Sequence, residues 1–347
     1  MRVSSCSACS GTFVECHPAV RKLSTLLTCA AGALVLASSA SASYGGIGPV
    51  SPVSPNGEKS ASAYWLVFAL TAGIFVLVEG ALVVFVIRFR SKGRARTVDG
   101  PDIHGSTKLE TAWTIIPVVL LAIIATFVFV NLPGYVHPAK AEEANALRIH
   151  VIGHQFYWEF RYPNGTLAFD QMVVPENKLV LLTIDSADVV HSWWIPAFGP
   201  KSDAIPGQTN HAWFKVSPDP SGAPRVFKGQ CSELCGYLHA KMSQTVRVLP
   251  QADYATWLQH QSGITAVALG KQEFAASCAK CHGAQAEGFI GPKLAGNSVA
   301  TDPKQLTPIV RNGRGKMPPV GNGWSQEQID ALVAYFQTKP FGGSSGQ

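Results

Sequence analysis

Charged residues are scarce in this 347-residue chain, at 14% of the sequence, whereas 47% of the residues are hydrophobic. This balance excludes an ordinary soluble protein and predicts membrane-spanning segments. The length also exceeds what one domain normally holds. A formal net charge of only +6 gives no strongly basic surface, so we expect no nucleic acid among the partners.

Sulfur-containing residues are few and unevenly placed. Of the eight cysteines, four lie in the first thirty residues and the other four form two short motifs, so none is left over. Two of the four methionines, Met242 and Met317, stand where a metal ligand is wanted. Paired thiols outside the cytoplasm tend to form disulfides unless a metal or a covalent cofactor claims them. For each of the two cysteine pairs, the surrounding sequence indicates a metal or a covalent cofactor that would prevent a disulfide.

The first motif, residues 231–242, reads CSELCGYLHAKM and contains two thiols, a carboxylate, an imidazole and a thioether. Thiolate, imidazole and thioether are the ligands that copper takes in electron-transfer centres, and His191, in the upstream segment HSWWIP, supplies a second imidazole. Zinc prefers four ligands and no thioether. The alternative interpretation is a disulfide between Cys231 and Cys235.

The motif, together with the upstream histidine, resembles the CuA centre of cytochrome c oxidase subunit II. The segments Gly153-His-Gln, 188–191 and 201–207 are also similar to that family. The resemblance implies two coppers bridged by the thiolates of Cys231 and Cys235, with His191 and His239 as terminal imidazoles and with Met242 and the carbonyl of Glu233 as weak axial ligands. It also implies that the Glu233 carboxylate faces a magnesium ion shared with subunit I.

The N-terminal part of the chain predicts a secreted leader and a membrane hairpin. Residues 1–42 have the basic, apolar and small-residue regions of a signal peptide, and a linker rich in Gly, Pro and Ser follows over 43–62. The apolar runs 63–87 and 112–132 are each long enough to cross a bilayer. Between them lie Arg88, Arg90, Lys92, Arg94 and Arg96, so the positive-inside rule places this loop in the cytoplasm and everything after residue 133 outside.

Two carboxylates accompany the hairpin. The resemblance implies that Glu110, just before the second span, is the entrance of a proton channel. The segment Thr107-x-x-Glu110 is equally a capping box for the helix that begins there, so both interpretations stay open. Glu79 lies inside the first span, where an ionisable group is costly, so we expect it either to have a functional role or to face another helix.

Residues 140–250 predict an all-β domain. Apolar and aromatic residues gather in 147–162, 179–184 and 245–249, with Pro and Gly turns between, which is typical of short strands. The resemblance implies a cupredoxin-like sandwich with the copper loop at one end. Phe156 stands where the family has its electron-input tryptophan. Side chains two apart in a strand share a face, so Trp158 is the candidate for this role.

The second sulfur motif opens a C-terminal domain over 264–340, after a polar, partly helical connector at 251–263. Cys278-Ala-Lys-Cys281-His282 is the attachment signature of c-type haem. The thiols of Cys278 and Cys281 bind the haem covalently, His282 is the proximal ligand, and Met317 is the only downstream thioether for the sixth position. Helical spacing over 325–337 completes an all-α class I cytochrome c domain. A zinc knuckle would need a second ligand pair nearby.

The whole chain is therefore predicted to be a multi-domain membrane protein that resembles subunit II of caa-type haem-copper oxidases. This resemblance implies that electrons pass from the haem to CuA and then to subunit I, where oxygen is reduced to water while protons are pumped. The implied partners are subunits I and III and a donor that is cytochrome c or a cytochrome bc complex. The implied location is the bacterial inner membrane, with both redox domains on the periplasmic side. The alternatives are a CuA subunit of a nitric oxide reductase and a copper-carrying assembly protein, although a carrier has little use for a haem.

Overall fold

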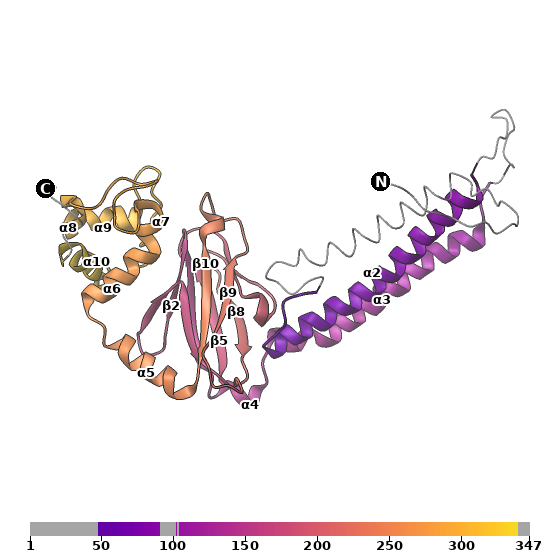
Figure 1. Ribbon diagram of the computed structural model, residues 1–347, viewed down its shortest axis with the longest axis horizontal. Coiled ribbons are helices and arrows are strands. Elements are labelled where there is room, and N and C mark those ends of the chain that lie inside the picture. Colours follow the sequence, from indigo (N-terminus) through magenta and orange to yellow (C-terminus); the bar gives the residue numbers. More distant parts are fainter. Residues whose placement is uncertain (1–47, 91–101, 103, 339–347) are drawn as a thin grey trace, which may run out of the picture. The chain divides into compact units, whose positions relative to one another are not determined.

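The structure is a computed structural model that describes residues 48–90, 102 and 104–338. The predicted signal peptide over 1–42 and the basic residues Lys92, Arg94 and Arg96 lie outside the described residues. The described elements belong to one compact unit that begins at Ser51. They comprise a helical hairpin, a β-sandwich and a helical domain (Figure 1).

Two long apolar helices form the hairpin, α2 (Pro55–Arg88) and α3 (Thr107–Val136) (Figure 1). They lie side by side, and the hydroxyl of Tyr135 donates to the carbonyl of Lys59 over 2.9 Å. Their apolar centres are not buried by other parts of the described chain, as expected for surfaces that face lipid. Helix α2 begins at Pro55, so residues 55–62, which were predicted to be linker, are helical. Its length of about 50 Å therefore exceeds the thickness of the apolar core of a bilayer. Pro55 begins this helix, where its missing N–H has no cost.

Glu110 lies in the first turn of α3, but the predicted capping box is shifted by one residue. The residue before the helix is Ser106, and Thr107 is already helical. The carboxylate of Glu110 accepts a hydrogen bond of 3.3 Å from the Ser106 amide, so it still binds a free N–H at the helix start. Glu79 is exposed on α2 and packs against no helix of the described residues.

The β-domain consists of two five-stranded sheets packed face to face. One sheet has the strand order β3-β2-β1-β5-β8 and the other has the order β4-β10-β9-β6-β7. The bounds are β1 (Leu147–His154), β2 (Tyr157–Arg161), β3 (Leu167–Phe169), β5 (Leu179–Ser186) and β8 (Asn210–Lys215), and then β4 (Gln171–Pro175), β6 (His191–Trp194), β7 (Ser202–Ala204), β9 (Arg225–Cys231) and β10 (Ser243–Leu249). A short helix, α4 (Lys140–Glu143), precedes the sandwich. The predicted all-β sandwich is thus confirmed.

Strand pairing brings the sequence-distant metal motifs to one end of the sandwich. Strand β6 begins at His191 and pairs antiparallel with β9, which ends at Cys231. The register places Trp193 opposite Cys231. The loop after Cys231 contains the short helical turn η3 (His239–Lys241) and returns directly into β10. The copper loop follows β9, and His191 lies at the start of the neighbouring strand β6. Both therefore lie at the same end of the sandwich.

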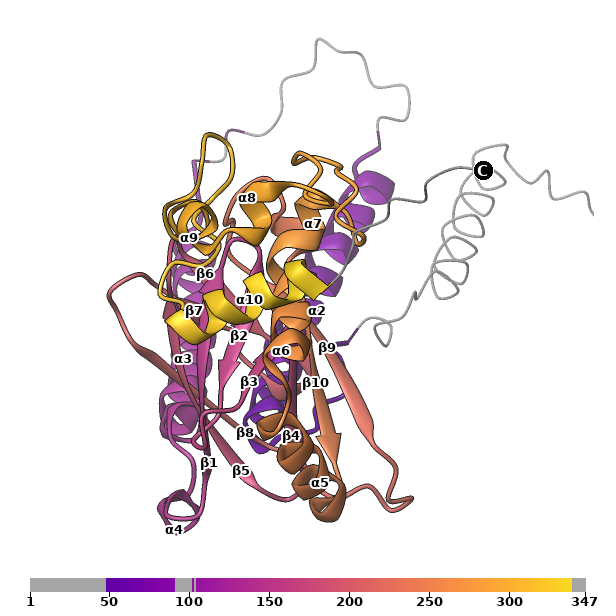
Figure 2. The same cartoon turned by 90° about the vertical axis from the view of Figure 1, so that its left-hand side faces the viewer.

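The C-terminal domain is all helical, as predicted. Its elements are α6 (Ala266–Glu273), η4 (Phe274–Cys278), α7 (Ala279–His282), α8 (Ser298–Thr301), α9 (Pro303–Asn312) and α10 (Gln326–Thr338) (Figure 2). Helices α6 and α10 pack closely, and Gly270 allows this contact. A Cβ at Gly270 would lie only 2.0 Å from the carbonyl oxygen of Ala331. The wide π-helical turn η4 leads into the haem motif, and such turns are frequent at functional sites.

The connector between the two domains is more ordered than its sequence suggested. Residues Gln251–Ser262 form one helix, α5. Trp257 of α5 packs against Tyr162 of the sandwich with ring centroids 5.3 Å apart, and Gln261 donates to the carbonyl of Leu167 over 3.0 Å. The connector is therefore a packed helix.

A buried joint fastens the helical domain to the sandwich, and its centre is Tyr157 at the start of β2. The hydroxyl of Tyr157 donates to the carbonyl of Val320 over 2.7 Å and accepts from the indole N–H of Trp324 over 2.8 Å. Tyr157 is fully buried and Trp324 nearly so. The Tyr157 hydroxyl and the Trp324 indole N–H are therefore both satisfied where water is absent, which favours a stable contact.

We expect Tyr157→Phe to loosen this joint. The change leaves the Val320 carbonyl and the Trp324 indole without partners, and a buried group left unpaired costs about 1–3 kcal/mol. Amide hydrogen exchange across α10 should become faster. The matched control is Tyr162→Phe, because the Tyr162 hydroxyl binds both the amide and the carbonyl of Val173 within the sandwich. That variant should lower sandwich stability and leave exchange in α10 unchanged; equal exchange in all three proteins would contradict the joint.

Candidate metal centres

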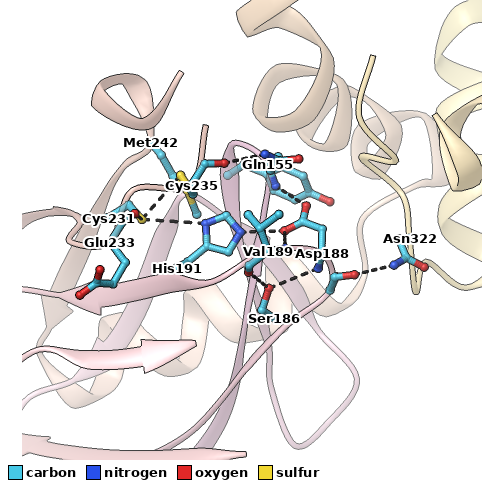
Figure 3. A network of polar contacts seen from close by, with 12 residues as sticks. Gln155, Ser186, Asp188, Val189, His191, Cys231, Glu233, Cys235, Met242 and Asn322 are labelled. Carbon is cyan, nitrogen blue, oxygen red and sulfur yellow. Dashed lines mark hydrogen bonds and ion pairs between the residues drawn. The ribbon is translucent and has the colours of Figure 1, made fainter. Parts of the chain in front are cut away.

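The predicted copper ligands converge at the end of the sandwich (Figure 3). The sulfurs of Cys231 and Cys235 lie 3.8 Å apart. Around them, the Nδ1 atom of His191 is 3.9 Å from the Cys231 sulfur, and the Nδ1 atom of His239 is 3.5 Å from the Cys235 sulfur. The Met242 sulfur is 3.7 Å from that of Cys235. Soft sulfur and imidazole donors around one point fit copper better than a hard cation.

The alternative of a disulfide between the two cysteines does not match the structure. A disulfide needs sulfurs about 2.05 Å apart, and both residues are free thiols here. Hydrogen bonding from Cys235, together with His191 and against the effect of burial, lowers the pKa of the Cys231 thiol to about 3. The same contact raises the pKa of Cys235. A bound cation favours the deprotonated form of both thiols, so this close pair of free thiols suits a metal.

A buried carboxylate orients His191. Its Nε2 atom lies 2.7 Å from the Oδ1 atom of Asp188, so Nδ1 is the nitrogen that faces the sulfurs. Asp188 also accepts from the amides of Gln155 and Val189 at 2.6 Å each. Burial raises the pKa of Asp188, but the hydrogen bond with His191 and those amides outweigh it and lower the pKa overall. A carboxylate behind a metal-bound imidazole fixes its tautomer and increases its basicity.

Two glycine-dependent contacts make room for the site. A Cβ on Gly153 would lie 2.8 Å from the His191 ring, so only glycine leaves that ring its place. Gly236 has a φ of +131°, and a Cβ there would lie 3.0 Å from the Phe156 ring. The side-chain amide of Gln155 also donates to the carbonyl of Cys235 over 2.5 Å. The segment Gly153-His-Gln therefore packs against both His191 and the copper loop.

Glu233 presents two different groups to two sides. Its backbone carbonyl lies 3.2 Å from the Cys231 sulfur. Its carboxylate points away from the other candidate ligands (Figure 3). This carboxylate pairs with the Lys201 ammonium at 2.6 Å. Lys201 also binds Asp203 at 2.7 Å. These charges are partly exposed, so the pairing contributes little stability and leaves the carboxylate available.

The expectation that Trp158 presents its indole beside Phe156 is not met. The Gln155-Phe156 peptide lies in the turn before β2, so the rule of alternation along one strand does not apply across it. Trp158 is fully buried, and its ring lies edge-on to His191 with centroids 6.0 Å apart. A partner protein therefore cannot touch Trp158. Phe156 packs instead against Tyr237, with centroids 5.1 Å apart.

In the haem motif, His282 is held in a defined orientation. The Nδ1 atom of His282 donates to the carbonyl of Pro292 over 2.7 Å, which leaves Nε2 free for iron. A Cβ on Gly291 would lie 2.6 Å from the His282 ring, so the chain approaches this ring as closely as a glycine allows. Met317 is partly buried against the domain core. Cys278 is buried and Cys281 is half-buried, each as a free thiol. These residues fit a covalent haem.

Sequence reasoning missed the supporting residues Asp188, Gln155 and Tyr237. The Asp-x-x-His spacing of 188–191 was a usable signal for Asp188, because a carboxylate so close to a candidate ligand often orients it.

We expect Asp188→Asn to weaken copper binding by about 10–100-fold, the usual effect of losing a carboxylate behind a metal ligand. The measurement is copper affinity by competition with a chelator, together with the electron paramagnetic resonance spectrum. Asp185→Asn is the matched control, because Asp185 pairs with His150 at 2.7 Å on a partly exposed surface. Equal affinity in both variants would contradict the role given to Asp188.

Family models match three segments of the chain. The transmembrane domain of cytochrome c oxidase subunit II matches residues 49–130, and the periplasmic domain of the same subunit matches residues 166–249. The model described as cytochrome c oxidase, cbb3-type, subunit III matches residues 265–336.

Individual proteins are similar over most of the chain. Cytochrome c oxidase subunit 2 of Alkalihalophilus pseudofirmus is 32% identical over 312 residues, which cover 81% of this chain and 89% of the relative. The protein of the same name from Cereibacter sphaeroides is 32% identical over 298 residues, which cover 71% and 94%. Among solved structures, the periplasmic domain of subunit II of cytochrome oxidase (CoxB) of Bradyrhizobium japonicum is 35% identical and covers 37% of this chain and 96% of that chain, with a TM-score of 0.32.

Proposed function

Because the chain belongs to the cytochrome c oxidase subunit II family, we propose that it receives electrons at its own haem c and passes them to CuA and then to subunit I. It is a subunit of a haem-copper oxidase and carries a cytochrome c domain. Bound at these sites, copper and haem iron each supply a one-electron redox couple. The alternatives of a nitric oxide reductase subunit and a copper carrier are not favoured, because the matching family models all describe cytochrome c oxidase.

Ligand and positioning roles can be assigned to residues of this chain at both the copper and the haem centre. We assign the bridging thiolates to Cys231 and Cys235, the terminal imidazoles to His191 and His239, and the axial positions to Met242 and the Glu233 carbonyl; the haem ligands are Cys278, Cys281, His282 and Met317. Asp188 holds the first imidazole in position, and Pro292 does the same for the haem histidine. Trp158 and the rest of the sandwich core keep water from the copper ligands on the inner side.

The observation that carries this proposal is the contact between the haem motif and the copper loop. Lys280, inside the haem motif, donates to the carbonyl of Phe156 over 2.8 Å and pairs with Asp170 at 2.6 Å. Phe156 in turn packs against Tyr237 of the copper loop. A haem domain fixed at this place needs no diffusion to reach the copper site.

Further parts of the proposal concern the surroundings of the chain. Subunit I is the partner, and we propose subunit III and an external donor, cytochrome c or a cytochrome bc complex, as additional ones. The Glu233 carboxylate is suited to a magnesium ion held jointly with subunit I, because it is partly exposed and hard oxygen ligands are what magnesium prefers. The chain lies in a membrane through α2 and α3, and we propose the bacterial inner membrane with both redox domains in the periplasm.

The test is to end the chain after Pro250 and to follow copper reduction in the assembled oxidase by stopped flow. All copper ligands precede the cut, so the copper spectrum should persist and serves as the control for folding. Reduction by a dilute external cytochrome c should slow greatly, because a donor held in place acts at an effective concentration on the order of millimolar. An unchanged rate would make the haem domain an accessory.

The two interpretations of Glu110 are separated by Glu110→Gln. Glutamine keeps an oxygen that can accept from the Ser106 amide, so the start of α3 should be preserved and assembly unchanged. Proton entrance at Glu110 requires an ionisable group, so oxygen reduction should slow and proton uptake should fall if Glu110 has that role. Normal turnover and normal proton uptake would leave Glu110 with the helix-capping role alone.

A further inference from the structure

One side chain of the copper loop reaches the haem motif directly. Tyr237 follows the bridging Cys235 by two residues, and its hydroxyl oxygen lies 3.7 Å from the sulfur of Cys281. Cys281 is one of the two thiols that bind the haem. The side chain of Tyr237 therefore spans the distance between a haem-binding sulfur and the backbone next to a copper-binding sulfur.

The position of Tyr237 is defined by contacts on both sides. Its ring meets Phe156 edge to face, at an angle of 71° and a centroid distance of 5.1 Å, and Phe156 itself is 3% exposed. Gly236 lets the loop lie against the same phenyl ring, since any Cβ there would lie 3.0 Å from it. On the other side, Lys280 donates to the Phe156 carbonyl, which fixes the residue next to Cys281. Phe156 thus holds both ends of the contact.

We propose that Tyr237 is the bridging residue through which electrons pass from the haem to the copper centre. Electron tunnelling decays more slowly along covalent bonds than across gaps. The route from Cys281 to Cys235 contains one gap, the 3.7 Å contact, and then continues through the tyrosine side chain and the backbone of Gly236. This inference rests on the proposed electron transfer from haem to copper.

The step balances without a further reactant. One electron leaves ferrous haem, which becomes ferric, and the copper pair accepts that electron. Tyr237 is neither oxidised nor deprotonated, because it supplies only the tunnelling path. No bond forms or breaks. Phe156, which is buried beneath the tyrosine, then acts as its support.

The test compares two variants in the full-length chain within the oxidase. Tyr237→Leu removes the ring and the hydroxyl, and Tyr237→Phe removes only the hydroxyl that makes the contact. Leu234→Ala is the matched control, because Leu234 lies in the same loop and is 82% exposed. After a light-driven pulse of electrons into the haem, the rate of equilibration with copper is read from the absorbance of each centre.

Three further readouts separate a tunnelling role from a structural one. The midpoint potentials show whether the driving force has changed, and the copper paramagnetic resonance spectrum shows whether the ligands are intact. Amide hydrogen exchange of residues 320–324 shows whether the haem domain is still docked on Tyr157. We expect severalfold slower equilibration in Tyr237→Leu, a smaller loss in Tyr237→Phe and none in Leu234→Ala, while all three further readouts stay constant.

Two results would overturn the proposal. An unchanged equilibration rate in Tyr237→Leu would place the route elsewhere. A slower rate that is accompanied by faster exchange at residues 320–324 would make Tyr237 a docking residue. Failure of the proposed function itself would look different, because the haem and copper of the unmodified chain would then not equilibrate at all.

Discussion

The hydrogen bond from the Cys231 amide to the Met242 carbonyl, 2.9 Å long, closes the loop on which the copper site depends. It continues the antiparallel ladder of β9 and β10, in which Ser243 lies opposite Gln230. Because the sheet holds both ends of the loop, the intervening residues have little conformational freedom. Two thiols, an imidazole and a thioether are therefore brought together within this one loop. His191 joins them because β6 pairs with β9. Backbone pairing of β6, β9 and β10 therefore brings the candidate ligands together.

The sequence was most informative where chemistry is local. Cys231 to Met242 and Cys278 to His282 each gather candidate ligands within a few residues, so residue type and spacing predicted a soft-metal site and a haem attachment, while the role of each copper ligand was implied by the family resemblance. The apolar helices and the sandwich strands could be predicted for a similar reason, because composition and periodicity are properties of short stretches of sequence. The bounds were less predictable. Helix α2 begins at Pro55 because a helix continues for as long as its backbone is satisfied, whatever the thickness of the membrane.

The remainder depends on contacts between distant segments. The spacing of 188–191 pointed to Asp188, but only the fold shows that Asp188 pairs with His191 whereas Asp185 pairs with His150. Phe156 and Trp158 do not share a strand face, because Phe156 lies in the turn before β2 and Trp158 lies in the strand. Tyr157 reads as an ordinary core residue, and only the fold shows that the aromatic cluster it joins belongs to the helical domain, more than a hundred residues away.

The buried joint also explains why the copper face differs from one that serves a free donor. A surface for a transient partner must be soluble when the partner is absent, so it exposes its electron-input residue and keeps few buried polar groups. Here Phe156 is covered by Tyr237, and its carbonyl is bound by Lys280. If the helical domain departed, the Tyr157 hydroxyl would exchange its partners Val320 and Trp324 for water, and the Tyr157 ring would become exposed. Separation would therefore expose apolar rings and break buried hydrogen bonds together, and the cost keeps the haem domain docked. For the proposed external donor, this arrangement favours recognition by the outer surface of the haem domain rather than by the surface around the copper loop.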